Sequence, residues 1–263
     1  MMRGVRRLIT IPISHYCEKA RWALERAGLD YVEERHVQGI SILMARRAGG
    51  GETTPVLVAE EGVFGESEDI LRYADEHLDE DQRLFPADPR LRDEVIEVSR
   101  WLDDGLGPDG RRLMYAHMLT QRRQMLRVNN QGVPAWEARL MAALWPLATR
   151  MASRRLAIRP TTLPDDTPRV MQAFDTIAER LADGRRRLCG DRFTAADLTF
   201  ACLASSVLVP PEYGVRLPQL DELPDQIARD VRSFREHRAG QYALELFRTE
   251  RRVVSAPTPG LTS

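Results

Sequence analysis

Short apolar runs dominate the first 85 residues of the chain and predict a mixed arrangement of strands and helices. Strands are expected where apolar residues alternate or run together, at residues 5–13, 31–37, 55–59 and 63–64. Apolar residues at helical spacing predict helices at 16–27 and 67–77. The segment 39–51, which ends in three glycines, fits either a short helix or a loop. This order predicts a small α/β unit in which residues 55–64 form a hairpin.

Beyond residue 85 the pattern is helical almost throughout. The stretch 85–89 is stiff and rich in turn-forming residues, which indicates a domain boundary. Apolar residues recur at helical spacing in segments 90–106, 111–128, 136–156, 170–183, 194–209 and, as one or two helices, 223–248. Three prolines predict a loop at 159–168, and residues 251–263 lack a core-forming pattern and are expected to be disordered. We therefore expect an α/β domain at 1–85 and an all-helical bundle at 88–250.

Composition narrows the classes of function. The 263 residues carry a formal net charge of −1, which provides no general attraction to nucleic acid or to anionic membranes. No apolar run approaches the roughly 20 residues that span a bilayer, and residues 1–7 lack the pattern of a signal peptide. The three cysteines are widely spaced and lie in no metal-ligand motif, so neither a disulfide framework nor a metal site is expected. This composition fits a cytoplasmic protein with no nucleic-acid or membrane partner.

The first candidate site is the sequence Ser14-His15-Tyr16-Cys17, which follows the first expected strand and opens the first expected helix. A helix N-terminus presents backbone N–H groups and a partial positive charge, which together favour a thiolate. Ser14 fits two roles there, as the N-cap of the helix and as the donor of a hydrogen bond to a thiolate. Cys17 fits either a small buried residue or a low-pKa cysteine that forms mixed disulfides.

Two further motifs have both a structural and a ligand-binding interpretation. Pro55 begins an expected strand, and a cis Thr54-Pro55 bond would turn the backbone of Thr54 toward an open site. Ser67 fits the N-cap of the next helix, where free N–H groups suit a carboxylate, while Glu66 can accept from an ammonium group. Such a pair suits the head of an α-amino acid.

A fourth motif is structural on any interpretation. Thr194 and Asp197 stand three residues apart at the start of the expected helix 194–209. This spacing is typical of a capping box, in which the two side chains satisfy the first N–H groups of a helix.

Together these motifs resemble the glutathione transferase family over residues 5–85 and 88–250, because their order and spacing agree with it. The resemblance implies a thioredoxin-like N-terminal domain, an all-helical second domain, and glutathione as the co-substrate. It implies an enzyme, similar to serine-type bacterial members, that directs the glutathione thiolate at an electrophilic small molecule. A homodimer is usual in this family.

Roles for individual residues follow from the same resemblance. Ser14 matches the hydroxyl that stabilises the thiolate. Thr54 and Pro55 match the residues that hold the cysteinyl part of glutathione, and Glu66 and Ser67 match those that hold its γ-glutamyl head. The partner of the glycine carboxylate is left open among Gln38, Arg46 and Arg47.

Two alternatives remain at this point. The Ser14–Cys17 spacing also resembles a glutaredoxin motif whose first cysteine has become serine, so the protein could instead be a Cys17-dependent thiol transferase that removes glutathionyl groups. It could also be a glutathione-binding regulatory protein without turnover.

The arginines of segment 103–167 leave a second question open. Either they lie on solvated helix faces or they border a pocket for an acidic substrate; they are Arg111, Arg112, Arg122, Arg123 and Arg127. Three nearby residues fit either the lining of a second-substrate site or the core, namely Tyr115, Met118 and Leu119.

Overall fold

The computed structural model describes residues 5–158 and 163–251 and begins with a four-stranded mixed sheet in the order β2-β1-β3-β4. β1 (Arg6–Thr10) pairs in parallel with β2 (Tyr31–Arg35) and antiparallel with β3 (Val56–Ala59). β3 forms a hairpin with β4 (Gly62–Phe64). The predicted strands and hairpin are confirmed. The parallel strands β1 and β2 are joined by α1 (His15–Arg26), as a parallel pair requires.

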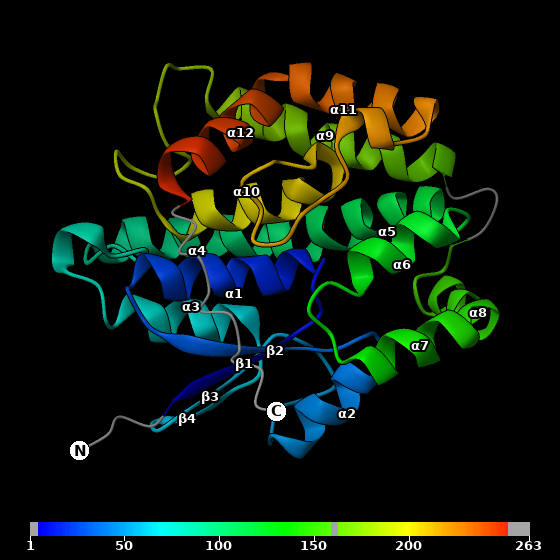
Figure 1. Cartoon of the computed structure of the whole chain (residues 1–263). Coiled ribbons are helices and arrows are strands. Elements are labelled where there is room, and N and C mark those ends of the chain that lie inside the picture. Colours follow the sequence, from blue (N-terminus) through cyan, green and yellow to red (C-terminus); the bar gives the residue numbers. More distant parts are fainter. Residues whose placement is uncertain (1–4, 159–162, 252–263) are drawn as a thin grey trace.

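Helices cover both faces of this sheet (Figure 1). α1 and α3 (Ser67–Asp75) lie on one face, and α2 (Ile40–Arg47) lies on the other. Successive strand residues point to opposite faces, so Leu8 packs in the large core with α1 while Ile9 packs with Ala45 of α2. The uncertain segment 39–51 therefore holds a helix, and that helix fills the second face.

The described residues from 89 onward form helices above the sheet (Figure 1). Their bounds are α4 (Pro89–Asp104), α5 (Leu106–Met118), α6 (Arg122–Asn129), α7 (Ala135–Ala143), α8 (Trp145–Arg155), α9 (Leu163–Arg180), α10 (Ala195–Leu208), α11 (Asp225–Glu236) and α12 (Arg238–Glu250). Two short 3₁₀ turns lie at Glu80–Gln82 and Leu220–Glu222. The fold prediction, a small α/β unit followed by a helical bundle, is confirmed.

α10 is the central helix of the bundle and packs against α1, α4, α5 and α12. It is buried almost throughout, as its apolar sequence predicts. The predicted capping box is present: the backbone N–H of Thr194 donates to Asp197 Oδ2 at 2.8 Å. Because α10 contacts α1 directly, this cap helps to set the platform on which the start of α1 rests.

Two helix predictions are wrong in detail. Segment 111–128 is two helices separated at 119–121, and α5 begins at Leu106. Segment 136–156 breaks at Leu144, because Pro146 has no N–H to donate to the carbonyl of Ala142. Arg122 Nη2 donates to that carbonyl instead, at 3.0 Å.

The predicted loop at 159–168 is wrong from residue 163, where α9 begins. Pro164 stands in the first turn, where a helix needs no N–H donor, and Pro168 leaves only one hydrogen bond unmade. The strong helical periodicity that follows outweighs that loss. Residues 163–168 of the predicted loop are thus helical.

The described part of the chain holds no helix both long enough and apolar enough to cross a bilayer. Of the stretch 251–263 that was predicted to be disordered, only Arg251 lies among the described residues. Arg251 is buried, so this residue belongs to the bundle and the prediction of disorder is wrong for it.

Candidate functional site

The turn between β1 and α1 places Ser14 at the N-cap of α1. Ser14 has extended backbone angles, and its Oγ accepts a hydrogen bond from the backbone N–H of Cys17 at 3.4 Å. The side chain is half-buried, so part of it faces outward. A hydroxyl both accepts and donates, and this contact uses Oγ only as an acceptor. The cap itself therefore does not use the hydroxyl hydrogen. The same hydroxyl also acts on the thiol of Cys17, whose pKa it helps to lower, so it is placed to donate to a sulfur beside the start of α1.

Cys17 lies one turn further along α1 and points into the protein. Its side chain is fully buried, and its Sγ accepts from the backbone N–H of Ile11 at 3.4 Å. Burial raises the pKa of this thiol, and the opposing effects of Arg21 and of nearby hydrogen bonds do not reverse the shift. These observations favour the structural interpretation of Cys17 over a low-pKa nucleophile.

The loop before β3 comes close to the same turn. The Thr54-Pro55 peptide bond is cis, as the ligand-binding interpretation predicts, and Pro55 is buried at the start of β3. The Thr54 side chain reaches Cys17, where its hydrogen bonding acts to lower the pKa of the thiol. The structure thus brings Thr54 and the Ser14 turn together.

The start of α3 lies across the same loop. Glu66, and not Ser67 as predicted, is the N-cap, because Glu66 has the extended backbone (φ −125°, ψ 152°) and Ser67 is already helical. The Glu66 side chain does not cap the helix but accepts from Thr53 Oγ1 at 3.0 Å. The backbone N–H groups of the first turn therefore lack a side-chain cap and can bind an anion.

Gln38 is engaged with the helical part of the chain. Its Nε2 donates to the Tyr115 hydroxyl at 3.0 Å and to Asn129 Oδ1 at 3.1 Å. Both amide hydrogens are thus used within the protein, which weakens the prediction that they bind a glycine carboxylate. Arg46 pairs with Glu52, whereas Arg47 is exposed.

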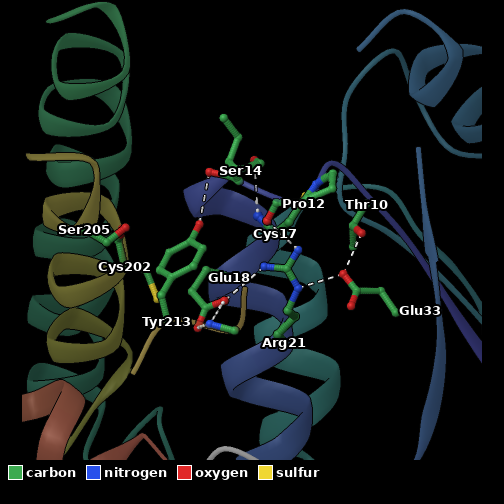
Figure 2. A network of polar contacts seen from close by, with 12 residues as sticks. Thr10, Pro12, Ser14, Cys17, Glu18, Arg21, Glu33, Cys202, Ser205 and Tyr213 are labelled. Carbon is green, nitrogen blue, oxygen red and sulfur yellow. Dashed lines mark hydrogen bonds and ion pairs between the residues drawn. The ribbon is translucent and has the colours of Figure 1, made fainter. Parts of the chain in front are cut away.

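A buried ionic network holds the turn that carries Ser14 (Figure 2). Arg21 donates to the carbonyl oxygen of Pro12 at 2.9 Å, to Glu18 Oε2 at 3.0 Å and to Glu33 Oε1 at 2.8 Å. Glu18 also accepts from Arg251 Nε at 2.8 Å. The side chains of Arg21, Glu18 and Arg251 are at most 1% exposed. Arg21 therefore ties the turn to α1, to β2 and, through Glu18, to the last described residue.

The loop after α10 completes this network from the other side (Figure 2). The Tyr213 hydroxyl donates to the carbonyl oxygen of Ile13 at 3.2 Å, directly before Ser14. The backbone N–H of Gly214 donates to both oxygens of Glu18 at 3.1 Å. Segments 200 residues apart in the sequence thus fix the position of one short turn.

α5 approaches the start of α1 closely because Gly107 has no side chain. A Cβ atom at Gly107 would lie 2.3 Å from the Tyr16 hydroxyl oxygen, which itself donates to the carbonyl oxygen of Asp103 at 3.1 Å. Lys19, which is the only lysine in the chain, donates to both carboxylate oxygens of Asp103 at 2.9 and 2.6 Å. Sequence patterns did not single out these contacts, although the Gly-Pro-Asp-Gly run at 107–110 is a signal of close packing.

Two buried groups at this site predict that acid destabilises the fold. Burial, together with Arg111 and Lys19, lowers the pKa of His15 from 6.5 to about 3. Burial acts to raise the pKa of Glu33, but Arg21 and Arg35 outweigh it and bring the pKa from 4.5 to about 2. In both cases the folded-state pKa lies below the unfolded value, so the stabilisation is complete above the unfolded pKa and is lost as the pH falls toward the folded one.

We therefore expect the wild-type protein to lose about 2 kcal/mol of stability through His15 alone between pH 6.5 and pH 4.5, since one proton is worth about 1.4 kcal/mol per pH unit. Urea unfolding of His15→Gln over this range should lack that loss. His77→Gln, at an exposed histidine, serves as the control. Equal pH slopes for wild type and His15→Gln would contradict the assignment.

Comparison with known proteins agrees with this geometry. The glutathione S-transferase N-terminal domain profile matches residues 8–82, and the C-terminal domain profile of the same family matches residues 131–229. The chain belongs to the glutathione S-transferase family. No curated protein sequence matches it significantly.

Solved structures show the same glutathione S-transferase fold at low sequence identity. A possible glutathione S-transferase from Rhodopseudomonas palustris has 14% identity and a TM-score of 0.59, covering 97% of this chain and 100% of that one. A glutathione S-transferase from Xanthobacter autotrophicus has 17% identity and a TM-score of 0.55, covering 96% and 95%. One from Methylobacillus flagellatus, solved with glutathione bound, has 15% identity and a TM-score of 0.53, covering 90% and 98%.

Most of the candidate residues lie in the part of the chain that the family's N-terminal profile matches. Ser14, Thr54, Pro55, Glu66 and Ser67 all lie within the matched N-terminal range of the glutathione S-transferase profile. Residues 83–130, which include α4, α5 and α6, lie between the two matched ranges. Among the described residues, no group of histidine, cysteine or acidic side chains is arranged to hold a metal ion.

Proposed function

We propose that this protein binds glutathione beside the start of α1 and directs its thiolate at an electrophilic small molecule. The observation that carries the proposal is the position of Ser14. It is half-exposed at a helix N-terminus, and the backbone hydrogen bond from Cys17 that caps the helix uses its Oγ only as an acceptor. A hydrogen bond from this hydroxyl to the sulfur favours the charged form of the thiol.

The surrounding residues suit the rest of the tripeptide. The backbone of Thr54, before the cis Pro55, would pair with the cysteinyl part. Glu66 would accept from the ammonium group, and the N-terminal turn of α3, with Ser67, would bind the carboxylate of the γ-glutamyl head. The glutathione-bound relative from Methylobacillus flagellatus supports this assignment at the level of the fold. We take residues 1–85 as the glutathione-binding domain and 88–250 as the helical domain.

In the proposed reaction, the glutathione thiol loses its proton to solvent and the sulfur attacks an electrophilic carbon. A C–S bond forms, and the leaving group departs with its bonding electrons. Ser14 acts by hydrogen bonding and not as a base, because a serine hydroxyl does not take up a proton at neutral pH. Holding the two reactants together provides the remaining acceleration.

Calorimetric titration of the full chain with reduced glutathione tests this proposal. We expect saturable heat with a dissociation constant of millimolar order or tighter. Absence of saturation at millimolar glutathione would overturn it. Saturable binding without turnover on a broad panel of electrophiles would instead favour the regulatory alternative.

One variant tests the Cys17-dependent alternative, which differs from the main proposal in what it predicts for deglutathionylation. Because Cys17 is buried and its pKa is raised, we expect Cys17→Ala to conjugate glutathione at nearly the wild-type rate. The measurement is kcat/KM with a chloronitrobenzene, alongside release of glutathione from a glutathionylated peptide. Loss of peptide deglutathionylation with intact conjugation would identify a thiol transferase activity at Cys17.

We further propose a cytoplasmic homodimer. Trp101 on α4 is 41% exposed beside a hollow of about 440 Å³ lined by residues of the same helix, including Ile96 and Glu97. An exposed aromatic side chain of this size suits an interface between subunits. Light scattering on the purified chain measures the oligomeric state directly.

A further inference from the structure

Arg111 on α5 is the arginine of segment 103–167 that lies at the candidate site. The carbon of its guanidinium is 5.9 Å from the centre of the Tyr16 ring, two residues from Ser14. Its charge also acts on the neighbouring His15, whose pKa it helps to lower, after the larger effect of burial. Arg111 thus places a positive charge across from the turn that carries Ser14.

The other arginines of this group lie elsewhere. Arg112 pairs with Asp109 and Asp166, Arg122 donates to the carbonyl oxygen of Ala142, and Arg127 pairs with Glu222. These three serve the helical part of the chain. Arg123 is exposed on α6.

Arg111 lacks any such partner. Its Nε atom is buried without a hydrogen bond, and no carboxylate among the described residues lies within 4 Å of its guanidinium. The nearby Asp103 is held by Lys19 at 2.6 Å, and the imidazole of His15 is neutral at pH 7 because its pKa is about 3. Buried polar groups in proteins almost always have partners, so the unpaired guanidinium of Arg111 is available to bind an anion.

The face of α5 on which Arg111 lies indicates where such an anion would bind. Arg111 and Tyr115 stand four residues apart and therefore share one face of α5. The Tyr115 hydroxyl is held by Gln38, which precedes α2. This face of α5 thus contacts the turn that carries Ser14 through Arg111 and the segment before α2 through Tyr115. Met118 belongs instead to the core, being 3% exposed.

We propose that Arg111 binds a carboxylate of the electrophilic second substrate, so that this transferase acts on anionic electrophiles. This inference rests on the proposed function and names the substrate class for the same site. A guanidinium forms two parallel hydrogen bonds to a carboxylate, which provides orientation as well as affinity. The residue lies between the two matched family ranges, so the family match assigns it no role.

A matched pair of substrates isolates the contribution of this charge. 4-Chloro-3-nitrobenzoate carries a carboxylate, and 4-chloro-3-nitrobenzamide is its neutral counterpart. In both, the glutathione thiolate bonds to the ring carbon that carries chlorine, and chloride leaves with the bonding electrons. The corresponding thioether conjugates can also be made separately, so binding can be measured by calorimetry whether or not the protein turns over these compounds.

We expect the wild-type protein to bind the benzoate conjugate at least tenfold more tightly than the benzamide conjugate, since a charge-assisted hydrogen bond contributes this much. Arg111→Met should abolish that preference, and the kcat/KM ratio of the two chlorides should fall in parallel. Arg123→Met, an arginine of the same segment on an exposed helix face, should leave the preference at its wild-type value.

The possible failures are distinguishable. If reduced glutathione and both conjugates fail to bind, both the proposed function and this inference are overturned. If both conjugates bind equally well and Arg111→Met changes neither, only the inference is overturned. If Arg111→Met weakens reduced glutathione as strongly as the benzoate conjugate, Arg111 binds a carboxylate of glutathione itself, and the assignment to the second substrate is overturned.

Discussion

Replacing Arg21 with methionine is expected to lower the free energy of unfolding by about 3–5 kcal/mol, the largest effect of any substitution considered. Removing one partner of a buried ion pair leaves the remaining charge without compensation, and that loss has this magnitude. Here the carboxylates of Glu18 and Glu33 both lose a donor, and so does the carbonyl oxygen of Pro12. Urea unfolding monitored by fluorescence measures the change.

Arg7→Met provides the matched control, because Arg7 also pairs with a glutamate but is 46% exposed. An exposed pair contributes at most about 1 kcal/mol. Adding Glu33→Gln to Arg21→Met should recover part of the lost stability, since it removes the charge of a buried carboxylate that has lost one of its two arginine partners. Equal losses in Arg7→Met and Arg21→Met would contradict the assigned role of the buried network.

The second large effect is expected at Ser14. Ser14→Ala should lower kcat/KM for conjugation by about 10- to 100-fold at pH 6.5, because a hydrogen bond to a charged group contributes about 1.5–3 kcal/mol. The deficit should shrink as the pH rises above the pKa of the thiol, where glutathione ionises without help. The same variant loses the N-cap of α1, at a cost of about 1 kcal/mol in stability.

Ser14→Thr separates these two effects, since threonine keeps the hydroxyl and can still cap the helix. We expect it to retain most of the activity at pH 6.5. A deficit in Ser14→Ala that stays constant from pH 6.5 to pH 9 would indicate a structural role for Ser14 and no role in ionising glutathione.

Local patterns were sufficient to predict much of the fold and part of the site. Alternation and short apolar runs located β1 to β4, the Thr194–Asp197 spacing located the cap of α10, and a strand followed by a serine located the start of α1. Each of these depends on neighbours within a few residues. The local structure that these segments favour is kept in the folded protein because the tertiary contacts favour the same structure.

The rest depends on contacts between distant segments, which periodicity does not report. Glu18, Lys19 and Arg21 look like a solvated helix face, yet all three are at most 1% exposed, because partners such as Arg251 come from 233 residues away. The break at Leu144 follows from Pro146 alone, but the donor that satisfies the freed carbonyl oxygen of Ala142, Arg122, comes from a separate helix and could not be predicted. The same limit hid the position of Arg111, one of several arginines in its segment.

The most direct test of the account measures the ionisation of bound glutathione. The thiolate absorbs near 240 nm, so a pH titration of the complex reports the pKa of the sulfur. We expect this pKa to lie one to two units below the roughly 8.5 of a free thiol in the wild-type complex, and near the free value in Ser14→Ala. An unshifted wild-type pKa, or the same lowered pKa in both proteins, would contradict the claim that the Ser14 hydroxyl stabilises the thiolate.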